Sequence, residues 1–448
     1  MDDYELERIG SDNPALAVPA AQRVQPGRQR SNGNVKSTAA RSDDTLRADT
    51  SPLPTKYDVG WRRIVRNFSP SWFSVTMGTG IVSLLLAAIP FEAQWLYWLA
   101  VIFLGLNAIL FTCAFSISII RYSLYPEIWT VMIADSTNSL FLGTVPMGFA
   151  TLISAWCTLC IPYWGPWAVT LAWVCWMIDS VVSVAVTISL TVLLISASNR
   201  QNLDRITAVQ LLPIAASIVA AGTGARVAEH LPDPENALGT LIASYIMWGM
   251  ATPLAMTVLV MYYTRLALHK LPPREIVVSS FLPLGPLGMG GYAITYLGST
   301  ARRVFRQTDF FPDVPVAGDI FFVVGAFIAL IMWAFGLTWL CFALASIYKS
   351  RPFPFNMGWW GFTFPLGVMA LSTMEFGRIF PSLFFRVLGT IFAVAVIFLW
   401  CIVAAGTARG AWNGRLFNAP CLKNLPKKER EEPKDGSERE KGTATPTE

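Results

Sequence analysis

Hydroxyl side chains lie within uncharged, glycine-containing stretches that otherwise resemble lipid-soluble helices. Residues 70–86, for example, read PSWFSVTMGTGIVSLLL. One face of such a helix would present hydroxyls and backbone dipoles to water, and these partial charges stabilise an anion without trapping it. Ordinary packing of small residues between membrane helices is the alternative interpretation. The residues predicted to line a hydrated path are Thr76, Thr79, Ser83, Thr144, Thr151, Ser217, Thr223, Thr295, Ser299 and Thr363.

Ionisable side chains are almost absent from the long apolar stretches. Cation paths usually carry acidic side chains, and proton relays use Asp, Glu or His. Their absence from the glycine- and proline-containing stretches therefore favours an anion. Asp179, in WMIDSVVSV, is the only carboxylate deep within an apolar stretch. It is a candidate for proton coupling, with a structural hydrogen bond to a neighbouring helix as the alternative.

Enzymatic and metal chemistry find little support in the residue pattern. Cys157 and Cys160 form a C-x-x-C without a nearby histidine or second C-x-x-C, which favours packing over metal binding. The only histidines, His230 and His269, fall in predicted loops. No phosphate-binding loop with a lysine after its glycines is present, which disfavours ATP as the energy source. We therefore predict neither a cofactor, nor a metal, nor an enzyme.

The elements that must position these residues are long apolar helices. The chain has 448 residues, of which 54% are hydrophobic and 14% charged, against roughly 25% charged in a soluble domain. Ten stretches approach or exceed the roughly 20 residues needed to cross a bilayer, and in lipid only helices satisfy their own backbone groups. The sequence thus predicts an all-α polytopic membrane protein with ten transmembrane helices. These lie at about 71–90, 95–120, 138–161, 166–195, 206–225, 238–264, 276–301, 320–348, 355–374 and 387–408.

Proline and glycine alternate along these ten segments. The odd-numbered segments carry glycines and, except for the first, internal prolines, whereas the even-numbered ones are continuous and apolar apart from Pro253 in the sixth. An interior proline bends a helix and frees a carbonyl that then needs water or a hydroxyl. The pattern predicts five tandem hairpins whose odd helices line a central pore and whose even helices face lipid. The predicted kinks lie at Pro146, Pro213, Pro283, Pro286 and Pro365.

Lysine and arginine near the segment ends indicate how the chain is oriented. They concentrate on the side of both termini, whereas the opposite side carries Arg226, Arg302, Arg303, Arg306 and Arg378. The excess of positive charge predicts that both termini are cytoplasmic. Residues 1–56 and 421–448 lack an apolar period and are predicted to be disordered tails around a membrane domain at 57–420.

Several motifs resemble those of a known transporter family. NFSPSWFSVTMGTGI, LGTVPMGFATL, FLPLGPLGMGG and FNMGWWGFTFPLGV are similar to segments of fungal sulfite efflux pumps, in order and over about residues 61–420. These pumps belong to the tellurite-resistance/dicarboxylate transporter family, which includes fungal malate transporters and is related to plant slow anion channels.

This resemblance implies a fold, a function and one site residue. The implied fold has ten helices in quasi-five-fold arrangement, with an aromatic gate at the position of Phe364. The implied function is export of sulfite or bisulfite across the plasma membrane through a gated pore, which gives sulfite resistance. A proton-coupled malate transporter and an anion channel are the alternatives. The implied partners are a small inorganic anion, the lipid bilayer and further copies in a dimer or trimer, without nucleic acid.

Overall fold

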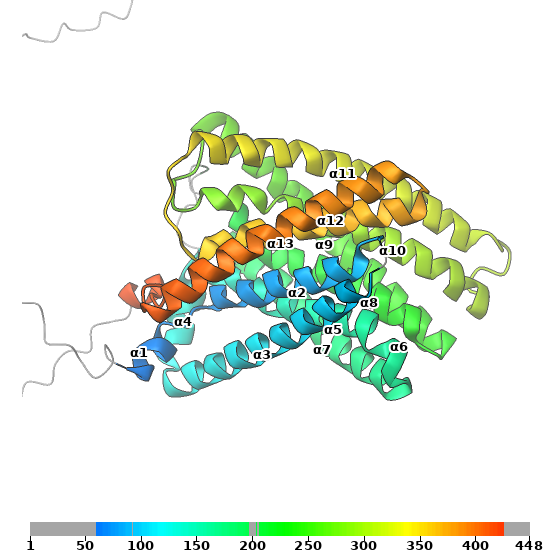
Figure 1. Ribbon diagram of the computed structural model, residues 1–448, viewed down its shortest axis with the longest axis horizontal. Helices are drawn as coiled ribbons and strands as arrows, with labels where there is room; N and C mark the ends of the chain where they lie inside the picture. The colour runs from blue at the N-terminus through cyan, green and yellow to red at the C-terminus, as the bar shows by residue number, and fades with distance from the viewer. Residues whose placement is uncertain (1–59, 92, 197–202, 204–205, 425–448) are drawn as a thin grey trace, which may run out of the picture. The chain divides into compact units, whose positions relative to one another are not determined.

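The computed structural model describes residues 60–91, 93–196, 203 and 206–424, and these fold into helices and connecting turns without a strand. The predicted tail 1–56 lies outside the described residues, as does the predicted C-terminal tail beyond residue 424. The short helix α1 (Trp61–Arg66) lies at one end of the bundle and α6 (Ile161–Trp164) at the other (Figure 1). We call these the α1 end and the α6 end.

Five hairpins in chain order make up the bundle. Each joins a short helix to a longer one that packs against it, in agreement with the alternation of prolines and glycines along the sequence. The pairs are α2 (Phe73–Ala88) with α3 (Gln94–Leu124), α5 (Thr144–Leu159) with α7 (Pro166–Ser196), α8 (Leu211–His230) with α9 (Pro234–His269), α10 (Leu284–Thr308) with α11 (Ala317–Lys349), and α12 (Thr363–Ile379) with α13 (Leu383–Trp412).

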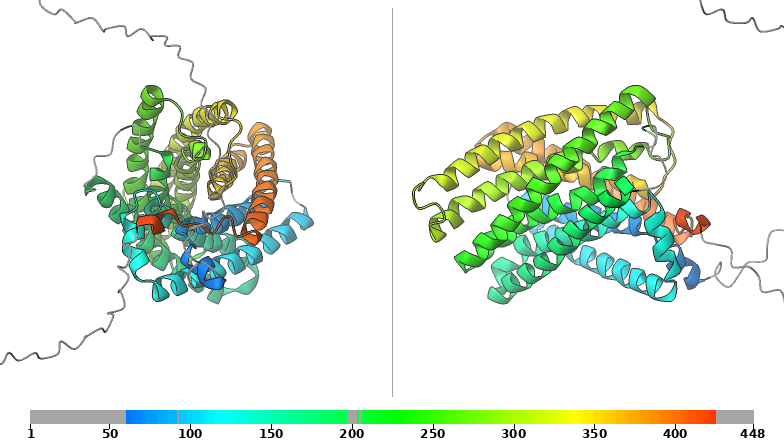
Figure 2. Two further views of the ribbon diagram at one scale, coloured as in Figure 1. Left: turned by 90° about the vertical axis from the view of Figure 1, so that its left-hand side faces the viewer. Right: turned by 180° about the vertical axis from the view of Figure 1, so that it is seen from behind.

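The first helices of the five hairpins form a closed ring. Helix α2 packs on α5, α5 on α8, α8 on α10, α10 on α12, and α12 returns to α2. Figure 2 shows the bundle from its α1 end. Between 67% and 94% of the residues are buried in the most apolar windows of α2, α5, α8 and α10, against 17% to 33% for α3, α7, α9, α11 and α13. The odd-numbered segments therefore lie inside and the even-numbered ones outside.

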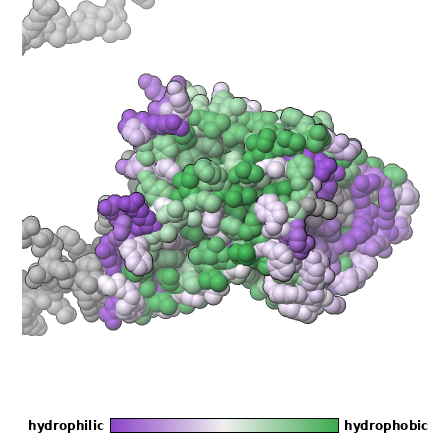
Figure 3. Space-filling model, viewed as in Figure 1, coloured by the Kyte–Doolittle hydropathy of each residue, from purple (hydrophilic) through white to green (hydrophobic). Residues whose placement is uncertain are grey.

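The outer helices present the surface that a bilayer would cover. They expose large apolar side chains along their length, and Figure 3 shows these as a broad hydrophobic band with hydrophilic residues towards both ends. Nine helices in the described part of the chain are long and apolar enough to cross a membrane. The prediction of an all-α membrane fold is thus confirmed. One exposed example from each outer helix is Ile109, Val181, Val260, Phe327 and Phe398.

Helix α12 is the member of the predicted ten that does not meet the same criteria of length and apolarity. Its α-helical part has 17 residues and includes Glu375 and Arg378. All its residues from Thr363 to Gly377 are buried, so its surroundings are protein rather than lipid. A helix that is enclosed by other helices can carry polar side chains that a lipid-facing helix cannot. The count of ten spans stays a prediction.

The inner helices begin in a shared way that differs from the predicted kinks. A 3-10 turn precedes each of them, directly in four cases and two residues earlier for α10. Pro146, Pro213, Pro286 and Pro365 occupy the first turn of their α-helices, and Pro283 lies just before α10. The first turn has no intrahelical acceptor for its N–H groups, so proline costs nothing there. At these prolines the chain changes from a 3-10 turn to an α-helix. The interior kinks that the sequence predicted at these positions are therefore replaced by helix starts. Pro253 of α9 does lie inside its helix.

Two glycines show why the inner ring can close. A Cβ atom on Gly288 of α10 would lie 2.7 Å from the backbone nitrogen of Met369 in α12. A Cβ atom on Gly143, just before α5, would lie 2.6 Å from the carbonyl oxygen of Leu212 in α8. Both contacts are with backbone, which cannot move aside as a flexible side chain does. Small residues of this kind let membrane helices approach closely.

Candidate functional site

A polar cavity of about 580 Å³ opens at the α6 end of the inner ring. We call it the vestibule. Arginines from three helices line it: Arg226 of α8, Arg378 of α12 and Arg386 of α13. Tyr292 of α10 and Glu375 of α12 line it as well. The cavity therefore offers more positive than negative charge to a solute.

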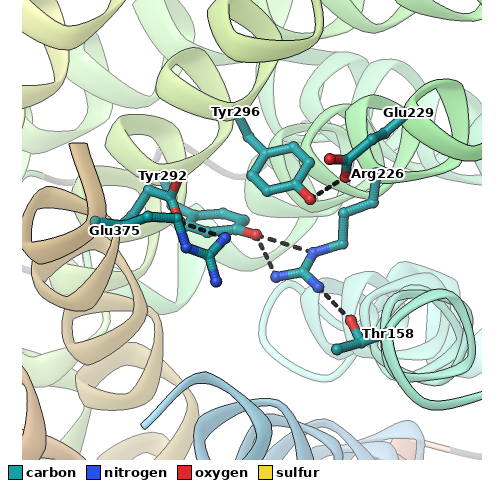
Figure 4. A network of polar contacts seen from close by, with 7 residues as sticks. Thr158, Arg226, Glu229, Tyr292, Tyr296 and Glu375 are labelled. Carbon is teal, nitrogen blue, oxygen red and sulfur yellow. Dashed lines mark hydrogen bonds and ion pairs between the residues drawn. The ribbon is translucent and has the colours of Figure 1, made fainter. Parts of the chain in front are cut away.

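Arg226 is the centre of this cluster (Figure 4). Its Nε atom donates a hydrogen bond of 2.9 Å to the hydroxyl of Tyr292, and its terminal nitrogens donate to Tyr292 and to Thr158 of α5. The guanidinium also lies over the rings of Tyr292 and Tyr296, 5.5 and 5.2 Å from their centroids. Hydroxyl oxygens and aromatic faces thus fix the guanidinium plane.

The two nearby carboxylates are engaged elsewhere. Glu229 accepts a hydrogen bond from the Tyr296 hydroxyl, and Glu375 lies 3.5 Å from a nitrogen of Arg378. No carboxylate among the described residues forms an ion pair with Arg226. A largely buried cation whose partners are neutral hydroxyls is costly unless an anion completes it. The vestibule is therefore suited to receive an anion at Arg226.

Two small cavities continue from the vestibule along the axis of the inner ring, and residues of all five inner helices line each of them. The Thr151 cavity has a volume of about 10 Å³ and shares Arg226, Tyr292 and Leu371 with the vestibule. The Met147 cavity, nearer the α1 end, also has about 10 Å³. Its wall is apolar and consists of Met77, Met147, Leu211, Leu212, Ala215, Leu282, Gly285, Pro286, Phe364 and Pro365.

Phe364 separates these two axial cavities. Its side chain is 3% exposed, and within the described part of the chain no other residue lines both the Thr151 and the Met147 cavity. Each cavity has room for about one water molecule, so the path along the axis is closed on both sides of the Phe364 side chain. Because the wall towards the α1 end is apolar, hydration of this constriction is unfavourable. The structure thus places Phe364 where a gate would act, and its gating role stays a prediction.

The predicted pore-lining hydroxyls do not gather on the axis. Thr151 lines the cavity named after it, and Thr223 forms a 2.9 Å hydrogen bond with Ser154, which lines that cavity too. The hydroxyls of Thr76, Thr79, Thr144, Thr295 and Thr363 donate to backbone carbonyls three or four residues earlier. Hydroxyls in membrane helices often satisfy themselves in this way.

Other hydroxyls in the predicted set point away from the axis. Ser83 donates to the carbonyl of Ala100 in α3, and Ser217 shares a 2.7 Å hydrogen bond with Thr187 in α7. Thr79 accepts a hydrogen bond from Trp400 of α13 and, with Thr76, lines a cavity between the outer helices. Ser299 of α10 is half-buried. Most of these residues therefore join inner helices to their neighbours.

Asp179 lies on the outer helix α7 and is 1% exposed. Neither carboxylate oxygen has a hydrogen-bond partner among the described residues. It occupies the same face as Trp176 and Thr187, which donate to the Ala220 and Pro213 carbonyls of α8. Asp179 lines none of the axial cavities. The structural hydrogen bond considered for it is absent from the described part of the chain.

The cysteines and histidines occupy positions that suit packing and capping. Cys157 and Cys160 are free, buried thiols. The histidines lie at helix ends rather than in loops: His230 ends α8 and His269 ends α9. The ring of His230 is 2.9 Å from the carbonyl oxygen of Arg226. Within the described ranges, no group of three potential ligands is placed to hold a metal.

The expectation that odd-numbered segments contain no ionisable residue is wrong. The fifth segment was predicted to end at residue 225 and the ninth at 374, where hydropathy falls, but α8 continues to His230 and α12 to Ile379. These extra turns bring Arg226, Glu229, Glu375 and Arg378 into the helices. The sequence ARVAEH carried a signal for this, because it has no helix breaker before Pro232.

Comparisons with known proteins agree with an anion path. A family model described as voltage-dependent anion channel (SLAC1) matches residues 67–408. The sulfite efflux pump of Arthroderma otae is 48% identical over 353 residues, which cover 79% of this chain and 93% of the relative. That of Candida albicans is 31% identical over 360 residues, or 75% and 72% of the two chains. The malic acid transport protein of Schizosaccharomyces pombe is 24% identical over 356 residues, or 76% and 77%.

Proposed function

Because this chain belongs to the voltage-dependent anion channel family, we propose that it exports sulfite or bisulfite from the cytoplasm. The observation that carries the proposal is the axial path, in which Arg226 joins the vestibule to a constriction at Phe364. The similarity to proteins named sulfite efflux pumps supports the choice of substrate. The protein acts as a gated transporter and not as an enzyme.

The proposed path uses one strong positive site and an otherwise neutral wall. An anion crosses the Met147 cavity once the Phe364 side chain swings aside, meets the hydroxyls of Thr151 and Ser154, and reaches Arg226. The guanidinium stabilises the charge, and the wide vestibule then exposes it to water. Binding at a single site of this kind is favourable enough for the ion to enter and weak enough for it to leave.

The transmembrane potential suffices as the driving force for a monoanion. The protein lies in the plasma membrane with the α1 end and both termini in the cytoplasm, as the excess of arginine and lysine at that end favours. Moving one negative charge out of a negative interior releases about 2.3 kcal/mol per 100 mV. No second energy source is then required. The path lies within one chain, so each copy in a dimer or trimer would carry its own.

Malate is the second candidate substrate, because the vestibule holds three arginines. A dicarboxylate needs fixed cations in its path, and the inner helices α8 and α12 supply Arg226 and Arg378. Two carboxylates could engage Arg226 and one of the outer arginines together. The preference for sulfite therefore rests on the relatives rather than on the charge of the path.

A flux assay separates the candidates. Liposomes that contain the purified full chain should release sulfite faster when their interior is made negative, and malate and chloride should leave more slowly at equal concentration. The passive mechanism fails if the flux ignores the potential and follows a pH gradient. Faster release of malate than of sulfite would assign the protein to dicarboxylates.

Asp179→Asn tests proton coupling. Because Asp179 lines no axial cavity, we expect potential-driven sulfite flux to change by less than about twofold. The neutral amide removes an unpaired buried acid, and such a group costs about 1–3 kcal/mol, so the thermal midpoint should not fall. Flux and melting are measured on the same preparation. Loss of a pH-driven component, with the melting temperature unchanged, would instead establish Asp179 as a coupling residue.

A further inference from the structure

An apolar groove of about 420 Å³ lies where the first and last hairpins meet. Its floor is α2 and its walls are α3 and α13, which lie on either side of α2 in Figure 1. The short helix α1 and the turn before α12 close it at the α1 end, through Ile64 and Trp360. The groove is separate from the vestibule and from both axial cavities.

The lining of this groove suits hydrocarbon rather than water. Ala404, Ala408 and Ala411 form the α13 wall and leave room that larger side chains would fill. Two tryptophan–threonine pairs in its lining are satisfied internally: Trp360 donates to Thr407 at 3.0 Å, and Trp400 to Thr79 at 3.1 Å. The indole N–H of Trp72, which also lines the groove, is buried without a hydrogen-bond partner among the described residues. No hydrogen-bonding group of these pairs is left for a polar ligand. A flexible alkyl chain is the ligand that such a surface favours.

The mouth of the groove at the α1 end is positively charged. Helix α1 reads WRRIVR, and its Ile64 lines the groove between Arg63 and Arg66. On the opposite wall, Arg409 follows the lining residue Ala408, and Arg415 lies near the lining residue Phe417. The segments 60–91, 93–125 and 383–424, which supply the walls, contain no aspartate and no glutamate.

Tryptophans place this mouth at the level of lipid head groups. Trp61 is 57% exposed and Trp412 is 92% exposed, and they stand at the ends of α1 and α13. Tryptophan is enriched at this interface because one part of its ring is apolar and the other polar. A chain lying in the groove would therefore have its polar head beside the arginines.

We propose that the groove binds an acyl chain of an anionic phospholipid, whose head group the α1 and α13 arginines hold. Charge complementarity selects this ligand over a neutral lipid, because clustered arginines at the interface attract anionic head groups. It also disfavours the same face of a second copy, which would bring like charges together. The acyl chain would contact Trp360, which lies four residues before Phe364. It would therefore support the start of helix α12, which carries Phe364.

Lipid retention by the purified full chain tests this site without any transport measurement. Native mass spectrometry should find phosphatidylserine retained at least about tenfold more than phosphatidylcholine of the same acyl length, because several arginines act on one anionic head group. The variant Arg62→Gln/Arg63→Gln/Arg409→Gln should lose this preference. The matched control Arg274→Gln/Lys349→Gln/Arg351→Gln removes three charges from the same end, outside the groove, and should keep it.

A second variant addresses the acyl chain. Ala408→Phe fills the groove and should abolish retention of phosphatidylserine while the melting temperature in detergent stays near that of the parent. Equal retention of the two lipids by the parent chain overturns the proposal, as does retention by a folded Ala408→Phe protein. A lipid-free dimer that Ala408→Phe dissociates would assign the groove to a second copy instead. A protein that retains phosphatidylserine but does not transport sulfite would contradict the proposed transport function and leave the lipid site supported.

Discussion

Replacing Phe364 by alanine should raise sulfite leak through the resting protein by at least about tenfold, which requires only about 1.4 kcal/mol off the barrier. Of the residues that the structure describes, only Phe364 lines both axial cavities. Its removal would join two spaces of about 10 Å³ each into one that water can fill. A hydrated constriction no longer excludes an ion by dewetting. The measurement is sulfite efflux from liposomes without an imposed potential.

Phe376→Ala is the matched control for this prediction. Phe376 lies on the same helix and is 1% exposed, but it packs against Trp333 and Phe385 and lines no axial cavity. Both substitutions should cost stability, by about 3–5 kcal/mol as for other buried phenylalanines. Only Phe364→Ala should leak. If the two variants leak sulfite equally, or if Phe364→Ala leaks no more than the parent, Phe364 has no role in gating.

Replacing Arg226 by glutamine should lower potential-driven sulfite flux by about 100-fold. A unit charge about 4 Å from an anion contributes about 4 kcal/mol at an effective dielectric constant of about 20, and part of this stabilisation is recovered from water and Tyr292. Among the described residues, Arg226 is the only cation shared by the vestibule and the Thr151 cavity, so none of them replaces it at that depth. Initial rates at several sulfite concentrations measure the effect.

Two further variants distinguish charge at this site from charge in general. Arg306→Gln removes one positive charge from the same end, where Arg306 pairs with Asp319 outside the cavities, and flux should change little. Arg226→Lys keeps the charge but lacks the planar fork whose separate nitrogens donate to Tyr292 and Thr158, so its flux should lie between the parent and glutamine values. The prediction is wrong if Arg226→Gln and Arg306→Gln behave alike in folded protein.

The arrangement of the helices could be predicted from the sequence because the inner and outer helices differ in composition. Helices that touch other helices all round need glycine, as the contact of Gly288 with α12 illustrates. Helices that face lipid need only apolar bulk, as in α3 and α13. Alternation between the two compositions therefore records which helices lie inside. The family motifs pointed the same way, and the membership they predicted is confirmed.

The site was harder to predict, because hydropathy measures the solvent that a residue faces and not the helix it belongs to. Arg226 and Glu375 looked like loop residues since charges mark the ends of lipid-facing segments. In an inner helix, however, they face a cavity. The hydroxyls were predicted to line the path, but most of them do not. A threonine such as Thr295 donates its hydroxyl to a carbonyl of its own helix. Its position in the sequence does not reveal which way its side chain points.

Helix α12 carries Phe364 in its first turn and Glu375 with Arg378 in its last. Eleven residues at a rise of 1.5 Å each separate Phe364 from Glu375 by about 16 Å along one unbroken rod. If α12 moves as a unit, we expect a displacement at Glu375 and Arg378 to reach Phe364. An ion arriving outside would thereby influence how readily the next one departs, and flow in the two directions would be unequal.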